Sequence, residues 1–364
     1  MNVLSLFDGM SCGRQALERA GIKVDNYYAC EIDKYAIQVT MKNYPDTIQL
    51  GDVRNIKAED LPKIDIMMGG SPCQSFSFAG KRAGMSTKCN QEILTLDEYL
   101  KLKQENFEFE GQSYLFWEYM RVLKQVNPTY FLLENVKMSK KWEEVLSNAI
   151  GVKPILINSS LVSAQNRKRL YWTNISDKIE QPSDKGIYLK DILEEEVDEK
   201  YYLSSSVVER FKEKLVSTSI DEKDVVTLNL QRRNPDRPSL LNGGKSGSGP
   251  LVKNDGKSYC LDTFNSQAID IVGGDFRTDE GFRWREGGKT GTLAARARND
   301  ESCGQLAKIG HVIRKLTPVE CERLQTVKDN YTEGVSNTQR YKMIGNGWTV
   351  DVTVHILSYI NKSN

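Results

Sequence analysis

The turn Gly69-Gly70-Ser71-Pro72-Cys73-Gln74 follows a run of apolar residues and presents a cysteine. Glycine and proline punctuate turns of this kind, in which a thiol can be held rigidly and partly exposed. A thiolate is a strong nucleophile, so Cys73 is a candidate for covalent catalysis once its proton has been removed. The alternative is a buried structural thiol, which is the commoner fate of a single cysteine.

Two further segments carry side chains suited to the same chemistry. Glu134 directly follows the apolar run Phe131-Leu132-Leu133, where a carboxyl group can donate a proton, although it could equally cap a following helix. Arg167 and Arg169 alternate just before an expected strand, so both guanidinium groups can point to one face. Such planar donors bind carbonyl oxygens, carboxylates or phosphates, but an ordinary solvated basic run is the commoner case.

A second group of residues suits a ligand that carries a nucleoside. Residues 7–13 form a loop between an expected strand and helix, where backbone N–H groups approach ligands. Glu31 ends the next strand, where an acidic residue accepts from a ribose, and Asp52 could accept from an adenine amino group. The turn Gly345-Asn346-Gly347 lets the backbone approach a ligand closely. The alternative is that Asn346 only caps the last helix. The loop lacks GxGxxG, which disfavours a dinucleotide site, and a purely structural turn stays open.

These residues sit on an alternating pattern of strands and helices. Apolar runs predict strands over residues 3–7, 27–31, 64–68 and 129–133. Helical periodicity predicts helices over residues 11–20, 33–42, 115–125, 319–325 and 348–360. The alternation predicts an α/β fold with a doubly wound parallel sheet, in which ligands bind at the carboxyl ends of the strands. A polar, helix-prone insertion between Met85 and Gly111 interrupts this pattern, as functional lids do.

Composition limits the class of protein. The chain has 364 residues, of which 39% are hydrophobic and 27% charged, and its net charge is +1, so we expect one or two globular domains. Seven cysteines without a CxxC motif, and only two histidines, argue against a metal site, a disulfide framework and a Ser-His-Asp triad. The start has no basic segment typical of a signal peptide, and we find no apolar run of membrane-spanning length.

Residues 176–313 differ in character from the rest. The chain becomes rich in glycine from Asn242, and residues 229–316 contain 15 Lys or Arg against 10 Asp or Glu. A local excess of positive charge on glycine-rich loops favours contact with nucleic acid. The alternative is a flexible insertion with solvated charges.

In their order along the chain, the motifs resemble those of the DNA (cytosine-5) methyltransferase family, in its bacterial or phage form. The matching segments are SLFDGMSCG, CEIDKYA, GDV, GGSPCQSFS, FLLENV, QNRKRLYW, KLTPVECERLQ and MIGNGWTVDV. The resemblance implies a doubly wound mixed sheet of the Rossmann-like, S-adenosylmethionine-dependent kind, built from residues 1–175 and 314–364. Residues 176–313 would form a smaller, loop-rich target-recognition domain.

The resemblance also implies roles for single residues. Cys73 would add to carbon 6 of a cytosine flipped out of duplex DNA, and Glu134 would engage ring nitrogen 3. Arg169 would hold the base carbonyl with support from Arg167, while carbon 5 takes the methyl group of S-adenosylmethionine. The residues expected at this cofactor are Phe7, Gly9, Met10, Ser11, Cys12, Glu31, Ile32, Asp52, Val53, Pro72, Leu115, Asn346 and Trp348. The residues expected at the DNA are Gln74, Ser75, Arg277, Arg283, Arg285, Arg296 and Arg298.

The expected partner is double-stranded DNA, bound by a monomer in the cytoplasm of a bacterial or phage-infected cell, without membrane or metal. A restriction endonuclease acting on the same site is a further candidate partner. Three other hypotheses stay open: a tRNA cytosine methyltransferase, a non-catalytic DNA-binding relative and an NAD-dependent oxidoreductase. The long middle segment disfavours the first. The presence of Cys73, Glu134 and both arginines disfavours the second, and the absence of GxGxxG disfavours the third.

Overall fold

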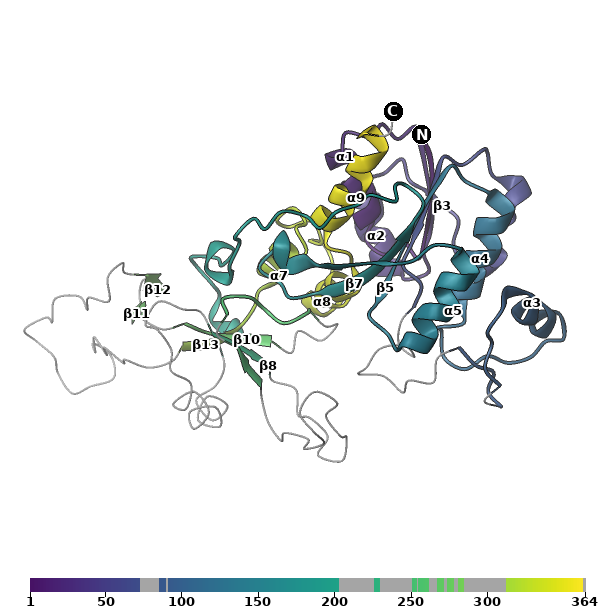
Figure 1. The fold of residues 1–364 in the computed structure, drawn as a ribbon. Coiled ribbons are helices and arrows are strands. Elements are labelled where there is room, and N and C mark those ends of the chain that lie inside the picture. The colour runs from purple at the N-terminus through teal and green to yellow at the C-terminus, as the bar shows by residue number, and fades with distance from the viewer. Residues whose placement is uncertain are drawn as a thin grey trace, which may run out of the picture.

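A large sheet with helices on both faces dominates the fold, and smaller strands lie to one side of it (Figure 1). The computed structural model describes residues 1–72, 85–89, 91–202, 226–229, 251–253, 255–261, 267–271, 274–277, 281–284 and 312–362. In this part of the chain no helix has both the length and the apolar character needed to cross a membrane.

The large sheet has seven strands in the order β3-β2-β1-β4-β5-β7-β6. They are β1 (Asn2–Leu6), β2 (Asn26–Cys30), β3 (Ile48–Gln49), β4 (Ile66–Gly69), β5 (Tyr130–Val136), β6 (Ile155–Asn158) and β7 (Lys168–Thr173). Neighbours from β3 to β5 are parallel, whereas β7 is antiparallel to β5 and β6. The doubly wound mixed α/β fold is thereby confirmed.

The fully parallel sheet that alternation alone predicts is wrong at β7. Only residues 159–167 connect β6 to β7, and a parallel return needs a crossover of a dozen or more residues. The chain therefore reverses direction, and β7 enters the sheet antiparallel to its neighbours.

Helices cover both faces of the large sheet because its strands are apolar on both sides. One face packs against α1 (Cys12–Arg19), α2 (Lys34–Asn43), α7 (Pro318–Leu324), α8 (Asn337–Asn346) and α9 (Val350–Lys362). The other packs against α3 (Leu96–Gln104), α4 (Leu115–Val126) and α5 (Lys140–Ile150). Along β4, Met68 points to the first face and Met67 to the second, as the two-residue period of a strand requires.

The two ends of the chain meet on one face of the sheet. Helix α9 packs against α1, Arg19 forms an ion pair with Asp351 at 3.0 Å, and the two termini lie close together in Figure 1. The expected final helix begins at Val350 rather than Trp348. The Gly-Asn-Gly turn does not open this helix, and Asn346 does not cap it: Asn346 is the last residue of α8, and Gly347 follows as its C-cap.

The remaining strands lie in the segment expected to recognise the target. An antiparallel sheet in the order β13-β10-β8-β9 contains β8 (Val226–Asn229), β9 (Leu251–Lys253), β10 (Gln267–Ile271) and β13 (Val312–Lys315). A separate pair joins β11 (Gly274–Arg277) to β12 (Gly281–Trp284). Leu189, Ile192 and Leu261 instead belong to the core on the α1 face of the large sheet, so parts of residues 176–313 pack against the large sheet and its helices.

The insertion after residue 85 contains the expected helical segment as α3. Thr95 caps this helix by accepting from the backbone N–H of Glu98. On the facing helix α4, the fully buried carboxylate of Glu118 accepts from the Tyr99 hydroxyl at 2.5 Å and from Arg121 Nε at 2.7 Å. It also accepts from Lys103 Nζ. One carboxylate therefore ties the insertion to the body of the protein.

The loop between β1 and α1 is held in an unusual conformation. Phe7 and Ser11 both have positive φ angles, 57° and 59°, which residues other than glycine rarely adopt. Asp8 between them accepts hydrogen bonds from the Tyr27 hydroxyl at 2.7 Å and from the Ser11 hydroxyl. Burial raises the pKa of Asp8 from 3.8 to about 6, although these hydrogen bonds lower it.

We expect Asp8 to make stability fall with rising pH. Its folded pKa lies above the unfolded value, so the folded state holds the proton more tightly, and this contribution is lost as pH rises through about 6. The free energy of unfolding of the wild type, relative to Asp8→Asn, should therefore fall by about 1 kcal/mol between pH 5 and pH 8. Urea unfolding of both proteins at the two pH values measures it. The prediction would be contradicted if the free energies of unfolding of the two proteins differed by the same amount at both pH values.

We expect Glu118→Ala to lower the free energy of unfolding by about 3 kcal/mol or more, because it leaves buried partners of a charged group unpaired. The matched control is Glu105→Ala at the end of α3, where an exposed carboxylate faces Lys101 at 4.0 Å. That change should cost less than about 0.5 kcal/mol. Urea unfolding measures both variants, and equal effects would show that Glu118 does not anchor the insertion.

Candidate active site

A cavity of about 580 Å³ opens where β1, β2, β4 and β5 end. It is lined by most of the side chains expected at a cofactor or a reacting base. These are Phe7, Gly9, Cys12, Glu31, Ile32, Asp52, Val53, Pro72, Leu115, Glu134, Arg167, Arg169, Asn346 and Trp348. Met10 and Ser11 do not line it: both are buried behind the wall, where Met10 packs in the core and Ser11 contacts Asp8 and Thr40.

Glu31 is oriented at one end of the cavity by three backbone donors. One carboxylate oxygen accepts from Gly9 N at 2.8 Å, and the other accepts from Ile32 N at 2.7 Å and Asp33 N at 2.8 Å. The carboxylate has about four acceptor sites in all, so it can still accept from hydroxyl groups of a ligand. This geometry fits the vicinal hydroxyls of a ribose.

Beside Glu31 the cavity offers apolar and polar groups to a flat ring. The side chain of Ile32 is 67% exposed, which is unusual for a large apolar residue, and it lines the cavity together with Phe7. Asp52 accepts from the backbone N of Arg54 at 2.9 Å and forms an ion pair with its exposed guanidinium. An apolar platform next to a carboxylate suits an adenine ring with its amino group.

Asp8 also lines the cavity, although the sequence analysis assigned it no role. Its position directly after β1, in a loop already expected to meet a ligand, is the signal that could have identified it. Cys12 lines the cavity too, and burial raises the pKa of its thiol to about 12. Cys12 is therefore a neutral, inert thiol.

The turn that leads to Cys73 lies between the two ends of the cavity. Gly70 passes so close to other groups that an added Cβ would lie 2.9 Å from Trp348 Nε1 and 3.2 Å from Glu134 Oε2, so a larger residue would displace the side chains of the cavity wall. Asn135 Nδ2 donates to the Ser71 hydroxyl at 3.0 Å and thereby holds the turn. Cys73, Gln74 and Ser75 themselves lie outside the described residues.

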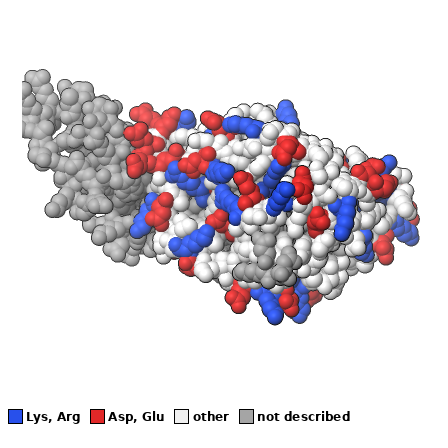
Figure 2. Space-filling model, turned by 90° about the horizontal axis from the view of Figure 1, so that it is seen from above, with Lys and Arg blue, Asp and Glu red and all other residues white. Residues whose placement is uncertain are grey.

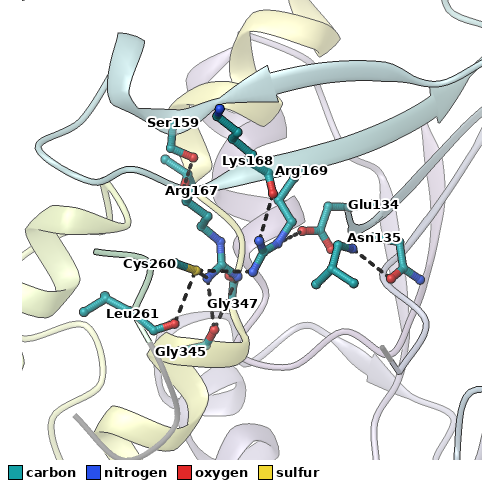
Figure 3. A network of polar contacts seen from close by, with 12 residues as sticks. Glu134, Asn135, Ser159, Arg167, Lys168, Arg169, Cys260, Leu261, Gly345 and Gly347 are labelled. Carbon is teal, nitrogen blue, oxygen red and sulfur yellow. Dashed lines mark hydrogen bonds and ion pairs between the residues drawn. The ribbon is translucent and has the colours of Figure 1, made fainter. Parts of the chain in front are cut away.

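Glu134 and Arg169 meet at the other end of the cavity (Figure 3). Arg169 Nε lies 3.0 Å from Glu134 Oε1, and both side chains are mostly buried. Glu134 lies within β5, and the next helix, α5, begins after Ser139, so the alternative in which Glu134 caps a helix is wrong. The arrangement places a carboxyl group and a guanidinium group side by side at the cavity surface, where both can bind one flat polar ring.

Arg167 is held behind Arg169 by the end of α8. It is 3% exposed, and its Nη2 donates to the carbonyl oxygen of Gly347 at 2.8 Å and to that of Gly345 at 3.3 Å. The alternative of a solvated basic run is therefore wrong for Arg167. As expected from the alternation, Arg167 and Arg169 point the same way: both approach the sulfur of Cys260 (Figure 3).

Cys260 was missed by the sequence analysis. It lies 91 residues beyond Arg169, inside the segment expected to vary with the target. No local motif marked it, because only the fold brings this segment to the arginines.

The arginines expected at the DNA are placed only in part. Arg277 ends β11 and Arg283 lies in β12, whereas Arg285, Arg296 and Arg298 lie outside the described residues. Figure 2 shows positive and negative side chains interspersed over the described part of the face that it presents. Among the described residues no group of three or more His, Cys, Asp or Glu side chains could hold a metal ion.

Comparison with solved structures supports the fold. The chain is similar to the methyltransferase EhMeth of Entamoeba histolytica, with a TM-score of 0.61 and 14% identity over 100% of this chain and 98% of that one. It is also similar to the DNMT2 of Spodoptera frugiperda, with a TM-score of 0.60 and 18% identity over 99% of both chains.

Comparison of sequences identifies the family. The chain is 27% identical to the orphan methyltransferase M.SPBetaI of Bacillus phage SPbeta, over 100% of this chain and 99% of that protein. It is 26% identical to the type II methyltransferase M.HhaI of Haemophilus parahaemolyticus, over 99% of this chain and 93% of that protein. A family profile described as C-5 cytosine-specific DNA methylase matches residues 1–362. The chain therefore belongs to the C-5 cytosine-specific DNA methylase family and is a DNA (cytosine-5) methyltransferase.

Proposed function

We propose that this enzyme methylates a cytosine flipped out of duplex DNA, through a covalent bond between Cys73 and carbon 6, with S-adenosylmethionine as methyl donor. The observation that carries the proposal is the single cavity that joins Glu31 and Asp52 at one end to the Glu134–Arg169 pair at the other. Gly70, Ser71 and Pro72, which lead to Cys73, line the same cavity, so one cavity can hold a nucleoside and a base together.

The residues divide the reaction between them. Carbon 5 of cytosine is a poor nucleophile until a thiolate adds to carbon 6. The Cys73 thiolate forms this carbon–sulfur bond while Glu134 donates a hydrogen bond or a proton to ring nitrogen 3, which draws electron density out of the ring. Once carbon 5 carries the methyl group, it loses its proton to water, the Cys73 thiolate is eliminated, and ring nitrogen 3 returns its proton to Glu134, which restores the aromatic ring.

Arg169 holds the base during these steps. Its guanidinium lies beside the Glu134 carboxylate, so it can donate to the base carbonyl while Glu134 faces ring nitrogen 3. Cytosine presents these two groups on one edge, and a guanidinium with a protonated carboxyl group beside it orients the ring against the thiolate. The base reaches the cavity only after it leaves the stack, which costs a few kcal/mol.

The opposite end of the cavity suits S-adenosylmethionine. When bound, this compound supplies the electrophilic sulfonium methyl group that carbon 5 accepts. Glu31 would accept from its ribose hydroxyls, and Ile32 and Phe7 would pack on its adenine ring. Asp52 and Val53 would face the adenine amino group, and the remaining wall is formed by Gly9, Cys12, Pro72, Leu115, Asn346 and Trp348. Met10 and Ser11 would act from behind this wall, by holding the loop after β1.

Recognition of DNA is assigned to residues 176–313, and catalysis to residues 1–175 with 314–364. The local excess of Lys and Arg in residues 229–316 supports this division, because neutralising phosphates contributes most of the non-specific affinity for DNA. Gln74, Ser75, Arg277, Arg283, Arg285, Arg296 and Arg298 are the proposed DNA contacts. The enzyme would act as a cytoplasmic monomer, with or without an endonuclease for the same site.

Trapping the covalent intermediate tests the nucleophile. Fluorine at carbon 5 cannot leave as a proton does, so DNA with 5-fluorocytosine at the target site should remain bonded to Cys73 after methyl transfer. We expect a complex that survives denaturing electrophoresis with the wild type and none with Cys73→Ala. Binding of S-adenosylmethionine by Cys73→Ala, measured by calorimetry, should stay within about threefold of the wild type, since the thiol is not needed for ground-state binding.

The target site is identified by incubating genomic DNA with the wild-type enzyme and then locating 5-methylcytosine by bisulfite sequencing. Absence of 5-methylcytosine would contradict the proposal, and so would a trapped complex that still forms with Cys73→Ala. Equal amounts of duplex DNA and tRNA in one reaction decide between the two substrates: methyl transfer to tRNA alone would overturn the assignment to DNA.

Replacing the acid tests the role of Glu134. Glu134→Gln keeps the shape of the side chain but cannot supply a proton to ring nitrogen 3, so kcat should fall by about 10²- to 10⁴-fold. Steady-state kinetics on the mapped DNA site measures this fall. The matched control is Glu144→Gln on α5, an exposed carboxylate that faces Lys140 at 3.7 Å. It should leave kcat unchanged, and an equal kcat in wild type and Glu134→Gln would rule out proton donation by Glu134.

A further inference from the structure

The segment of residues 255–261 is fixed against the loop that precedes β7. Ser258 N donates to the Ala164 carbonyl at 2.7 Å, and Asn166 N donates back to the Ser258 carbonyl at 3.0 Å. Leu261 N donates to the buried side-chain oxygen of Gln165 at 3.0 Å. Hydrogen bonds on both sides of residue 260 therefore set where its side chain lies.

A buried lysine strengthens this attachment. Lys257 is 9% exposed, and its Nζ donates to the carbonyl oxygens of Ser160 at 3.0 Å, Ser163 at 3.3 Å and Ile187. The same ammonium lies 4.7 Å from the centre of the Tyr188 ring. Three carbonyls around one cation leave it little freedom, so Lys257 holds the segment against residues 160–163 and 187.

The sulfur of Cys260 projects from this fixed segment toward the guanidinium groups of both arginines (Figure 3). Arg167 Nη1 lies 3.2 Å from Sγ, and Arg169 Nη2 lies 3.5 Å from it. Both distances are those of N–H donors to sulfur. One sulfur atom thus bridges the guanidinium that rests on α8 and the guanidinium that faces the cavity.

The local charges favour a sulfur that accepts from both arginines. Glu134 offsets one of the two guanidinium charges through its 3.0 Å contact with Arg169. Within the described chain, the other hydrogen bonds of the Arg167 guanidinium go to the neutral carbonyls of Gly345 and Gly347. Burial disfavours a charged thiol, but the nearby Arg167 and Arg169 outweigh it and lower the pKa of Cys260. By contrast, burial raises the pKa of Cys30.

We propose that Cys260 is a positioning residue for methyl transfer: its sulfur accepts from Arg167 and Arg169 and keeps the Arg169 guanidinium aimed at the base. The proposal deepens the role given to Arg169 above and rests on it. When a base enters, Glu134 turns toward ring nitrogen 3 and Arg169 loses part of its ion pair. The sulfur and the Lys168 carbonyl, at 2.9 Å from Arg169 Nη1, then remain to hold the guanidinium.

Two substitutions separate this role from simple packing. Cys260→Val matches the shape of cysteine but accepts no hydrogen bond, whereas Cys260→Ser keeps an acceptor. We expect Cys260→Val to lower kcat about tenfold to a hundredfold, the effect of losing a hydrogen bond to a charged group, and Cys260→Ser to recover most of that loss. The affinity for S-adenosylmethionine should change less than about twofold in both. Cys89→Ser, at an exposed cysteine, is the control and should match the wild type.

A double-mutant cycle asks whether Cys260 acts through Arg169. In the Arg169→Lys background, where the planar group is gone, Cys260→Val should change kcat by less than about twofold. A readout that needs no turnover is the ultraviolet absorbance of thiolate as the pH rises. Cys260→Ser should lose a thiolate signal that appears below the usual pH range of a thiol, while Cys89→Ser should keep it.

The outcomes distinguish this proposal from the proposed function. If the wild type forms no 5-methylcytosine, the function itself fails. If the wild type is active and Cys260→Val is equally active, Cys260 does not position Arg169. The same follows if Cys260→Val keeps more activity than Cys260→Ser. The proposal would likewise be overturned if Cys260→Val lowered kcat by the same factor in the Arg169→Lys background as in the wild type.

Discussion

The ion pair between Arg169 and Glu134 depends on the direction of one strand. Because β7 is antiparallel to β5, the first residues of β7 lie beside the last residues of β5, and Arg169 faces Val136 across the ladder. Glu134 is two residues from Val136, so it shares a face with Arg169 as a diagonal neighbour. In a parallel sheet the start of β7 would lie at the opposite edge, away from the strand ends that form the cavity. The mixed sheet is therefore a requirement of the active site.

The same antiparallel strand brings a buried charge to the end of a helix. Arg167 precedes β7 and donates to the Gly345 and Gly347 carbonyls, where α8 ends. Carbonyl groups at a helix C-terminus lack partners within the helix and carry partial negative charge, so they suit a buried guanidinium. This contact joins residues 178 and 180 positions apart. It links the strand that carries Arg169 to the segment that contributes Asn346 and Trp348 to the cavity wall.

Local patterns were enough to predict the strand–helix alternation and the positions of Glu134, Arg167 and Arg169 at strand ends. They failed where tertiary contacts decide the outcome. Helix α8 has few buried residues, Arg340, Met343 and Ile344, so its periodicity is weak and its last turn resembles a loop. The direction of β7 follows from the short connection before it. Cys260 could not be predicted at all, since its partners lie about 90 residues away. They are brought to it by the pairing of Ser258 with Gln165 and the contacts of Lys257 and Leu261.

The arrangement of charges also bears on which base the cavity can accept. In cytosine, ring nitrogen 3 is an acceptor, so a protonated Glu134 can donate to it, whereas in thymine and uracil the same nitrogen carries a hydrogen and would face that donor with a donor. A buried mismatch of this kind leaves two polar groups unsatisfied. Arg169 cannot make the distinction, because all three bases present a carbonyl oxygen at its position. In the role proposed for Glu134, selection of cytosine therefore falls to this residue, and its ion pair with Arg169 keeps the carboxyl group in place until the base arrives.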